Sequence, residues 1–237
     1  LRLLFAEAEG VAAAQAPLEP ALALLLGELA ERLQQWPAAE RWYRRLDQGE
    51  ARDRARLRLG VVLARQERFE AAMETLRALQ DDEAADGAIR REAYIAEADQ
   101  WESRRRRDDA IAALTRGLAV LEDDPGLRVA RARAARNAGR HAEAEADLRT
   151  VLARDPAHAP ALRALGALLV ARGEPARAEP LLARAWASEP RAPVAASWGE
   201  ALWLLGRTAE AREAWQKGRR LDPADPVLTD TLERYGQ

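Results

Sequence analysis

The chain has 237 residues, and its 37 Lys and Arg residues against 39 Asp and Glu residues give a net charge of −2. This balance provides no general attraction to the phosphate backbone of nucleic acids. The chain has no cysteine, which excludes disulfides, thiolate metal sites and cysteine nucleophiles, and it has no apolar run of the length that a transmembrane helix needs.

The first predicted element is an amphipathic helix that ends before Pro17. It has no preceding helix to pair with, so we interpret residues 1–19 as the second helix of a unit whose first half is missing. The chain begins at Leu1 and not at Met. We therefore expect a processed or truncated chain whose targeting signal lies upstream.

Two registers of small residues then repeat along the chain. The first is Gly27, Gly60, Ala98, Ala132, Gly166 and Gly199, with steps of 33, 38, 34, 34 and 33 residues. The second is Ala39, Ala72, Ala110, Ala144, Ala178 and Ala211, each 12 residues after its partner in the first. A period near 34 residues with helical patterning inside each repeat is typical of a helix-turn-helix solenoid.

The registers divide the chain into units with recurring signals at their turns and ends. Gly139, Gly173 and Gly206 lie between the two helices of a unit, and Pro156, Pro190 and Pro223 close the second helix. Extra acidic residues at 81–87 account for the longest step. We predict six units at 20–52, 53–90, 91–124, 125–158, 159–191 and 192–225, followed by a capping helix at 226–237.

The small registers predict where the two helices of a unit touch, because a missing side chain lets helix axes approach closely. Four residues after each second-register alanine stands a large apolar residue: Tyr43, Leu76, Leu114, Leu148, Leu182 and Trp215. We expect each of these to fill the space beside a small residue.

Three segments carry a resemblance to the tetratricopeptide repeat: GRHAEAEADLRTVLARDP at 139–156, GEPARAEPLLARAWASEP at 173–190 and GRTAEAREAWQKGRRLDP at 206–223. The resemblance extends from about residue 20 to residue 225. It implies an all-α, right-handed superhelical solenoid that offers a surface to other proteins.

The last unit, at 194–234, is similar to the C-terminal unit of tetratricopeptide lipoproteins of the Gram-negative outer membrane. The residues that carry the match are Gly199, Glu200, Leu202, Trp203, Gly206, Ala211, Trp215, Leu228, Thr231 and Arg234. This resemblance implies a periplasmic adaptor, tethered by a lipidated cysteine upstream of Leu1, for a processing protease or its substrates.

Candidate catalytic groups are few. His141 occupies the place that Trp36 and Phe69 have in earlier units, which favours a packing role, and His158 stands alone in a turn after Pro156. The chain has no Gly-rich phosphate loop, HExxH or GxSxG motif. We therefore expect no enzyme activity, no cofactor and no metal.

A groove lined by first helices is the expected binding site. In relatives that clamp a peptide carboxylate, an asparagine commonly follows the first small register, but that place holds Glu28, Val61, Asp99, Arg133, Ala167 and Glu200 here. The candidate groove residues are instead Arg133, Arg136, Asn137 and Arg163, flanked by Asp99, Glu102 and Glu200. A solvated surface of mixed charge explains the same residues equally well.

A run of four arginines, Arg104, Arg105, Arg106 and Arg107, falls in the predicted turn of the 91–124 unit. It is either a solvated turn before the helix-start residues Asp108 and Asp109, or an edge contact for an acidic peptide. Most of the seven tryptophans are expected in the core, with Trp186 and Trp198 partly exposed.

The sequence thus predicts a non-catalytic scaffold that binds a protein or peptide in its groove. Two alternatives stay open. One is self-assembly into a homo-oligomer through an exposed terminal unit, and the other is a regulatory or substrate-recruiting part of an enzyme complex.

Overall fold

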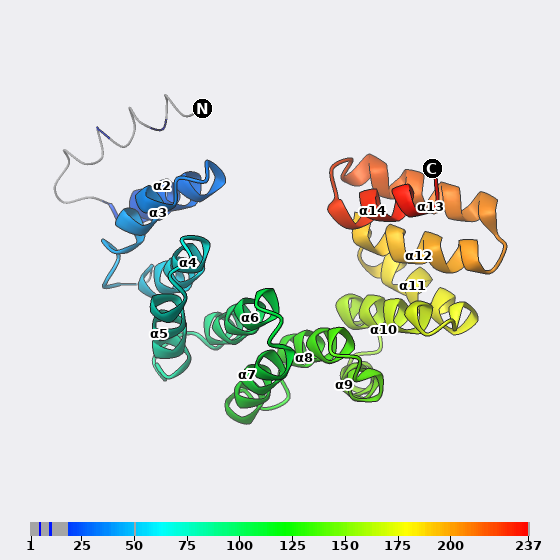
Figure 1. Ribbon diagram of the computed structural model, residues 1–237, viewed down its shortest axis with the longest axis horizontal. Coiled ribbons are helices and arrows are strands. Elements are labelled where there is room, and N and C mark those ends of the chain that lie inside the picture. Colours follow the sequence, from blue (N-terminus) through cyan, green and yellow to red (C-terminus); the bar gives the residue numbers. More distant parts are fainter. Residues whose placement is uncertain (1–4, 6–9, 11–18, 50, 237) are drawn as a thin grey trace. The chain divides into compact units, whose positions relative to one another are not determined.

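The computed structural model describes residues 5, 10, 19–49 and 51–236, and in these residues it contains thirteen α-helices and no strand (Figure 1). The helices are α2 (Pro20–Arg32), α3 (Trp36–Tyr43), α4 (Arg52–Arg65), α5 (Phe69–Gln80), α6 (Gly87–Ser103), α7 (Arg107–Val120), α8 (Pro125–Asn137), α9 (His141–Arg154), α10 (Ala159–Ala171), α11 (Pro175–Ser188), α12 (Ala192–Leu204), α13 (Thr208–Leu221) and α14 (Pro226–Arg234). The all-α prediction is confirmed.

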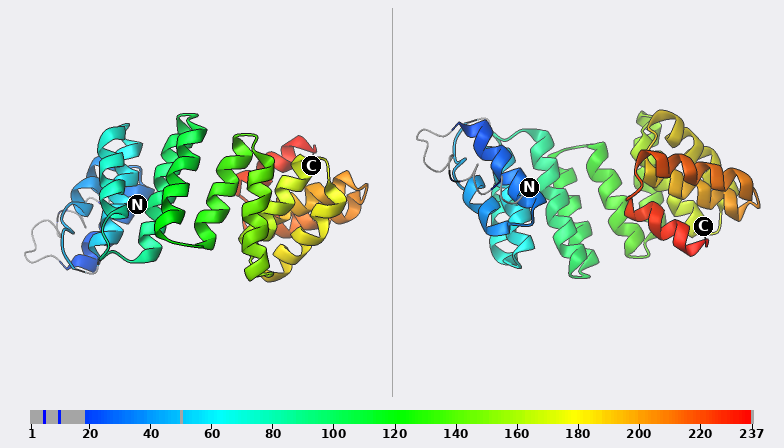
Figure 2. Two further views of the ribbon diagram at one scale, coloured as in Figure 1. Left: turned by 90° about the horizontal axis from the view of Figure 1, so that it is seen from below. Right: turned by 90° about the horizontal axis from the view of Figure 1, so that it is seen from above.

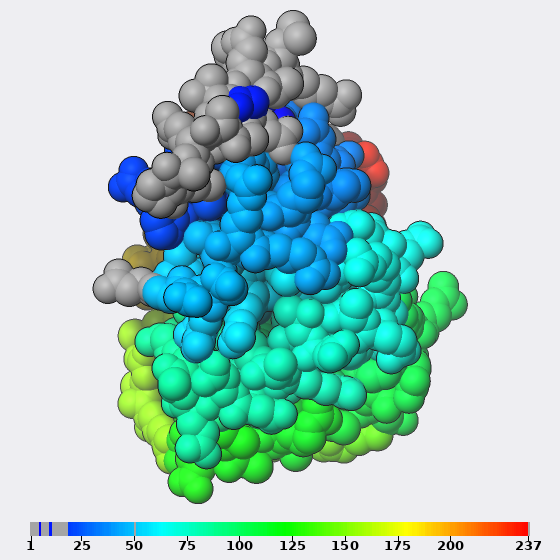
Figure 3. Space-filling model, turned by 90° about the vertical axis from the view of Figure 1, so that its left-hand side faces the viewer, coloured from blue at the N-terminus to red at the C-terminus, as the bar shows by residue number. Residues whose placement is uncertain are grey.

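The chain forms two compact units, residues 1–127 and 128–237, with the boundary inside α8. Within the first unit, α2 packs on α3, α4 on α5 and α6 on α7, and each pair also contacts the next (Figure 2). Within the second unit, α10 packs on α11 and α12 on α13 in the same way. The space-filling view shows the side chains of α2–α5 closing over one another without a break in the first unit (Figure 3).

Inside the pairs, glycines of the first register lie against the large apolar residues that stand four places after the second register, as the sequence predicts. A Cβ added at Gly60 would lie 2.7 Å from Leu76 Cδ2, and one added at Gly166 would lie 2.5 Å from Leu182 Cγ. The same relation joins Gly27 to Tyr43 and Gly199 to Trp215. Glycine inside a helix costs about 1 kcal/mol relative to alanine, and the close packing of these large side chains offsets that cost.

The turn inside each pair has one recurring geometry. One residue per turn has a left-handed backbone: Gln34 (φ 58°), Glu67 (φ 61°), Arg105 (φ 60°), Gly139 (φ 78°), Gly173 (φ 76°) and Gly206 (φ 78°). The next amide donates to a carbonyl five residues earlier, as in Arg140 N to Ala135 O at 2.8 Å and Gln35 N to Ala30 O at 2.8 Å. This is the Schellman ending of a helix, which favours glycine. The sequence places a glycine at this left-handed position only in the last three turns.

The third pair starts earlier than the sequence indicates. Asp86 accepts hydrogen bonds from the amides of Ala88 (2.8 Å) and Ile89 (3.3 Å), so α6 begins at Gly87, ahead of the predicted unit boundary at residue 91. An Asp cap satisfies amides that the first helical turn leaves without partners. The acidic segment 81–87 therefore holds a helix start as well as a loop.

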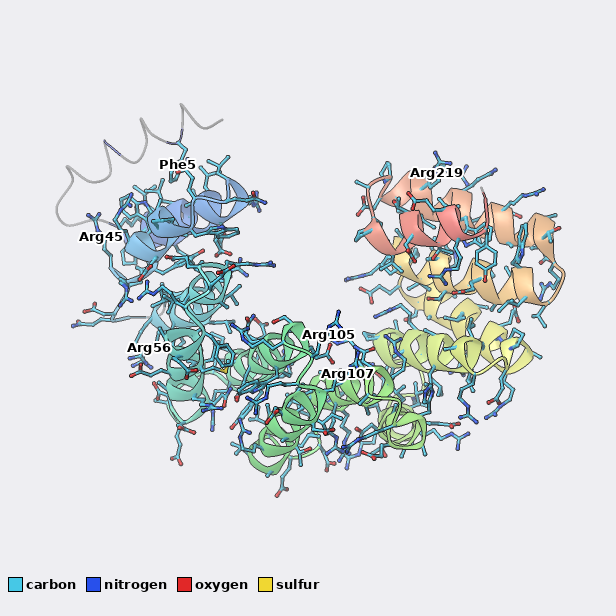
Figure 4. All side chains as sticks on the ribbon, viewed as in Figure 1. Phe5, Arg45, Arg56, Arg105, Arg107 and Arg219 are labelled. Carbon is cyan, nitrogen blue, oxygen red and sulfur yellow. The ribbon has the colours of Figure 1, made fainter. Side chains whose placement is uncertain are left out.

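The two ends of the described chain are both covered. At the C-terminal end, α14 packs against α12 and α13 and buries Leu228 and Thr231. At the N-terminal end, Phe5 is 1% exposed and belongs to the core cluster of α2 and α3 (Figure 4). The helix predicted at 1–19 otherwise lies outside the described residues.

Candidate functional site

Four arginines of the second unit form what we call the arginine cluster: Arg133 and Arg136 on α8, Arg163 on α10, and Arg191 at the N-cap of α12. Arg133 and Arg136 are three residues apart and share one face of their helix. The cluster thus draws on the first helices of three successive repeats, and three of its members were predicted from the sequence.

Electrostatics shows that these side chains act on one another. The pKa of Arg163 is lowered, first by burial and then by the positive charges of Arg136 and Arg133. Arg191 adds to the lowering, and Asp225 opposes it. A guanidinium whose pKa is lowered in this way is in an environment short of negative charge.

Arg163 also lacks direct partners. Among the residues that the structure describes, its guanidinium makes no hydrogen bond and no ion pair, and it is half-buried. Arg131, on α8, is by contrast paired with a carboxylate, because its guanidinium binds both carboxylate oxygens of Asp147 at 2.8 and 2.7 Å. Guanidinium groups without a carboxylate are suited to bind one from another molecule.

Two predicted groove residues, Asp99 and Glu102, lie on α6 in the first unit. Asp99 is exposed and lines a hollow of about 700 Å³ between the ends of α4 and α6. Arg65, Glu67 and Arg104 line the same hollow. The structure thus brings Asp99 together with one residue of the arginine run.

The arginine run occupies the turn between α6 and α7, with Arg107 as the first residue of α7 (Figure 4). Arg104 lies over the ring of Phe69 at 3.8 Å, and Arg106 lies over the ring of Trp101 at 4.3 Å. Arg106 also donates to Asp109 at 2.7 Å. Two of the four side chains therefore pack against the protein's own surface.

The last two predicted groove residues have partners inside the second unit. Asn137 ends α8 and accepts a 3.4 Å hydrogen bond from Arg136. Glu200 on α12 accepts hydrogen bonds from Arg234 at 2.9 Å and from the Tyr235 hydroxyl at 3.1 Å, next to the end of α14. Glu200 therefore helps to hold the capping helix in place.

Trp186 and Trp198 are partly exposed, as expected, and their rings stack with centroids 6.2 Å apart. Trp198 donates to Glu179 at 3.3 Å. Trp215 is 1% exposed and donates to the carbonyl of Ala196 at 3.2 Å, which places it in the core.

The sequence analysis missed a buried carboxylate, Glu97, which is 0% exposed. The position before the first small register holds Leu26, Leu59, Leu165 and Trp198 in four repeats but Glu97 and Arg131 in the other two. A charge at a position that is otherwise apolar was the available signal. Both charged residues turn out to bind an opposite charge across helices.

Glu97 is held by donors from three helices. It accepts from Arg77 (2.9 Å) and Gln80 (2.9 Å) on α5, from Trp101 (3.3 Å) on α6, and from Arg116 (2.8 Å) on α7. Burial alone raises the pKa of Glu97, but these hydrogen bonds and the charge of Arg116 outweigh it and lower the pKa below its ordinary value.

The two histidines each lie at the start of a helix. His158 accepts a 3.2 Å hydrogen bond from the amide of Ala161 and so caps α10. His141 is the first residue of α9, as Trp36 and Phe69 are of α3 and α5. In the described part of the chain, no group of three or more His, Asp or Glu residues is placed to hold a metal, and no helix is long and apolar enough to cross a membrane.

Comparison with known protein families identifies the repeats. Tetratricopeptide repeat families match residues 46–89, 96–159 and 135–198, which together make up more than half of the chain. The chain belongs to the tetratricopeptide repeat family. Such repeats generally form protein–protein interaction scaffolds without catalytic activity.

Among relatives of this tetratricopeptide repeat protein is the TPR repeat-containing protein PA4667 of Pseudomonas aeruginosa, which is 29% identical over 207 residues. The match covers 87% of this chain but only 29% of PA4667, so the chain spans less than a third of that relative.

Solved structures agree on the fold. A tetratricopeptide repeat protein from Parabacteroides merdae superposes with a TM-score of 0.70 at 17% identity, covering 98% of this chain and 90% of that one. The Thermus thermophilus protein TTC0263 gives 0.60 at 22% identity, covering 78% and 97%. PilW, a type IV pilus biogenesis factor, gives 0.62 at 16% identity, covering 90% and 98%.

Proposed function

We propose that this protein is a non-catalytic adaptor that binds an acidic, extended segment of a partner protein at the arginine cluster. One observation supports this proposal above the others. Arg163 is half-buried among like charges, and no carboxylate of the described chain pairs with it. A bound carboxylate would remove that repulsion and gain charge-assisted hydrogen bonds.

The choice of a protein segment as the ligand follows from the family and from the spacing of the cluster. Tetratricopeptide repeats generally bind proteins, and the cluster is spread over α8, α10 and the start of α12. Side chains on three successive first helices suit an extended chain with several acidic residues better than a single small anion. Asn137, beside Arg136, adds a polar group for the peptide backbone.

The test uses a fluorescein-labelled peptide of twelve residues rich in glutamate, with a glutamine version as its uncharged match. Fluorescence anisotropy should show that Arg163→Glu weakens binding of the glutamate peptide by about tenfold or more, because it replaces attraction by repulsion. Arg219→Glu is the matched control, since Arg219 is exposed on α13 of the same unit. We expect the control to change binding by less than about twofold, as charge effects at exposed sites are screened.

Equal losses in the two variants would show attraction to net charge alone and would refute a specific site. Circular dichroism of both variants separates this outcome from unfolding. Tight binding of the glutamine peptide would refute the acidic character of the ligand.

The resemblance of the last unit supports a finer proposal. The full-length protein would be a periplasmic adaptor, tethered to the outer membrane by a lipid upstream of Leu1, that brings a processing protease and its substrate together. Fractionation of cells that express the full-length protein tests the location, and recovery in the cytosol would refute it. Copurification followed by a protease assay tests the role, and a stable complex with unchanged turnover would count against it.

A further inference from the structure

Two connecting segments of the first unit are rich in carboxylates. Residues 81–86, between α5 and α6, and residues 121–124, between α7 and α8, together hold seven Asp and Glu residues and no Lys or Arg. Both segments join the second helix of one repeat to the first helix of the next, so they lie at the same edge of the unit. We call these two segments the acidic edge.

Ion pairs within the first unit hold the acidic edge in place. Asp82 pairs with Arg52 at 2.9 Å and with Arg56 at 3.2 Å, and both arginines belong to α4. Arg91 pairs with Asp124 at 3.3 Å and so connects α6, which follows the first segment, to the second segment. A surface whose shape is fixed before binding loses less conformational entropy when a partner docks.

Two other carboxylates of the acidic edge are available to another molecule. Glu83 and Glu122 are exposed, one in each segment, and neither makes a hydrogen bond or an ion pair in the described part of the chain. Asp86 is exposed as well, although one of its oxygens caps α6. Carboxylates at exposed turns can accept hydrogen bonds from the guanidinium groups of a second molecule without a change in the fold.

The two compact units have opposite net charges. Residues 1–127 contain 19 arginines and 25 Asp and Glu residues, whereas residues 128–237 contain 18 Lys and Arg residues and 14 Asp and Glu residues. The first unit is therefore negative and the second is positive. The positive unit carries the arginine cluster, where like charges lower the pKa of Arg163. Each copy of the chain thus has two surfaces of complementary charge, which speed and orient association.

We propose that copies of this protein associate head to tail, with the acidic edge of one copy bound at the arginine cluster of the next. This inference rests on the proposed function, because it makes a second copy of the chain a partner of the arginine cluster. Glu83 and Glu122 come from separate turns, which suits arginines that come from three helices. The two surfaces differ, so the association is heterologous and produces a ring or an open chain of copies.

Sedimentation velocity over a range of protein concentrations measures this association. We expect the average mass to rise with concentration in about 50 mM salt and to return to that of the monomer in about 500 mM salt, because salt screens the charges. Glu83→Arg combined with Glu122→Arg should weaken self-association about tenfold or more, and so should Arg163→Glu in a separate variant. Circular dichroism checks that both variants are folded.

The matched control for the acidic edge is Glu70→Arg combined with Glu74→Arg. It makes the same change in net charge at two exposed positions on α5 of the same unit. We expect it to change self-association by less than about threefold, since it lies outside the acidic edge and acts through screened charge alone.

A mixture of the two deficient variants tests which surfaces pair. The Arg163→Glu variant keeps its acidic edge, and the variant with both edge substitutions keeps its arginine cluster. One intact surface from each can therefore pair. We expect the mixture to form a heterodimer and to stop there, because neither variant has the second intact surface that a longer chain needs.

A wild-type protein that stays monomeric in low salt would overturn the inference, as would a control that weakens association as much as the edge substitutions do. A mixture that stays monomeric would overturn the pairing of the edge with the cluster. The glutamate peptide separates this inference from the proposed function. A monomeric protein that binds the peptide at its arginine cluster would refute self-association alone, whereas a protein that associates but does not bind the peptide would refute the peptide site.

Discussion

The six Schellman turns allow backbone strain to be tested in both directions, by placing glycine where another residue has a left-handed backbone and alanine where glycine has one. Three of them place a residue other than glycine in the left-handed region, and two of these, Gln34 and Glu67, are exposed with no hydrogen bond or ion pair of their side chains in the described structure. The left-handed conformation costs a residue with a Cβ about 1–2 kcal/mol. Glycine loses about 0.4–1 kcal/mol more in conformational entropy on folding, so the net gain is about 0.5–1 kcal/mol per site.

Gln34→Gly together with Glu67→Gly should therefore raise the free energy of unfolding by about 1–2 kcal/mol, since the sites lie in different repeats and should act additively. For a protein of this size, this corresponds to a rise in Tm of roughly 2–8 °C. Circular dichroism at 222 nm, followed through heat and urea unfolding, measures both quantities.

The opposite substitutions serve as the control. Gly173 and Gly206 have no atom within 4 Å of an added Cβ, so replacing them by alanine changes the backbone preference alone. Each should lose about 0.5–1 kcal/mol by the same reasoning. Stability that falls in Gln34→Gly, or that stays unchanged in Gly206→Ala, would refute the assignment of strain to these turns.

Three other changes have expected outcomes. Gly199→Ala forces the indole of Trp215 to move and should lower the free energy of unfolding by about 1–2 kcal/mol, because overpacking outweighs the helix preference of alanine. The near-ultraviolet circular dichroism of the tryptophans should change as well. A variant that is more stable than the wild type would contradict the packing. Because its pKa is lowered in the folded state, Glu97 stabilises the fold at pH values above the ordinary glutamate pKa, and wild-type stability should decline as the pH falls below about 4. Glu97→Gln should lose about 3 kcal/mol of stability at neutral pH. In urea titrations, the stability of this variant should depend less on pH in the acid range. Arg163→Leu should raise Tm while weakening binding of the glutamate peptide, because it removes a charge crowded by like charges; a lower Tm with intact binding would assign Arg163 to structure.

The repeat could be predicted from the sequence because its signals are local and recur. Glycine and alanine at fixed intervals predicted the helix contacts, and the structure places Leu76 against Gly60 and Leu182 against Gly166 as expected. The start of α6 was misplaced because the cap at Asp86 lies within an acidic insertion that interrupts the period.

The site was less accessible to sequence reasoning because it depends on contacts between repeats. Arg133, Arg136 and Arg163 were predicted by their places on first helices, but Arg191 joins them from the turn after Pro190, where the other repeats carry no arginine. Gly117 in α7 likewise makes room for the ring of Tyr94 on α6, and this role appears only when the two helices are placed together.

The buried carboxylate of Glu97 has a consequence for how the first unit assembles. Helices in a repeat array resemble one another, so each one has several near-equivalent neighbours with which it could dock out of order. Arg77 on α5 and Arg116 on α7 both donate to Glu97, and a slipped docking that removed these donors would bury a bare negative charge at a cost of several kcal/mol. Asp147, matched to Arg131 in the second unit, imposes the same condition there. Such matched polar groups favour the native order of helix docking in an otherwise repetitive chain.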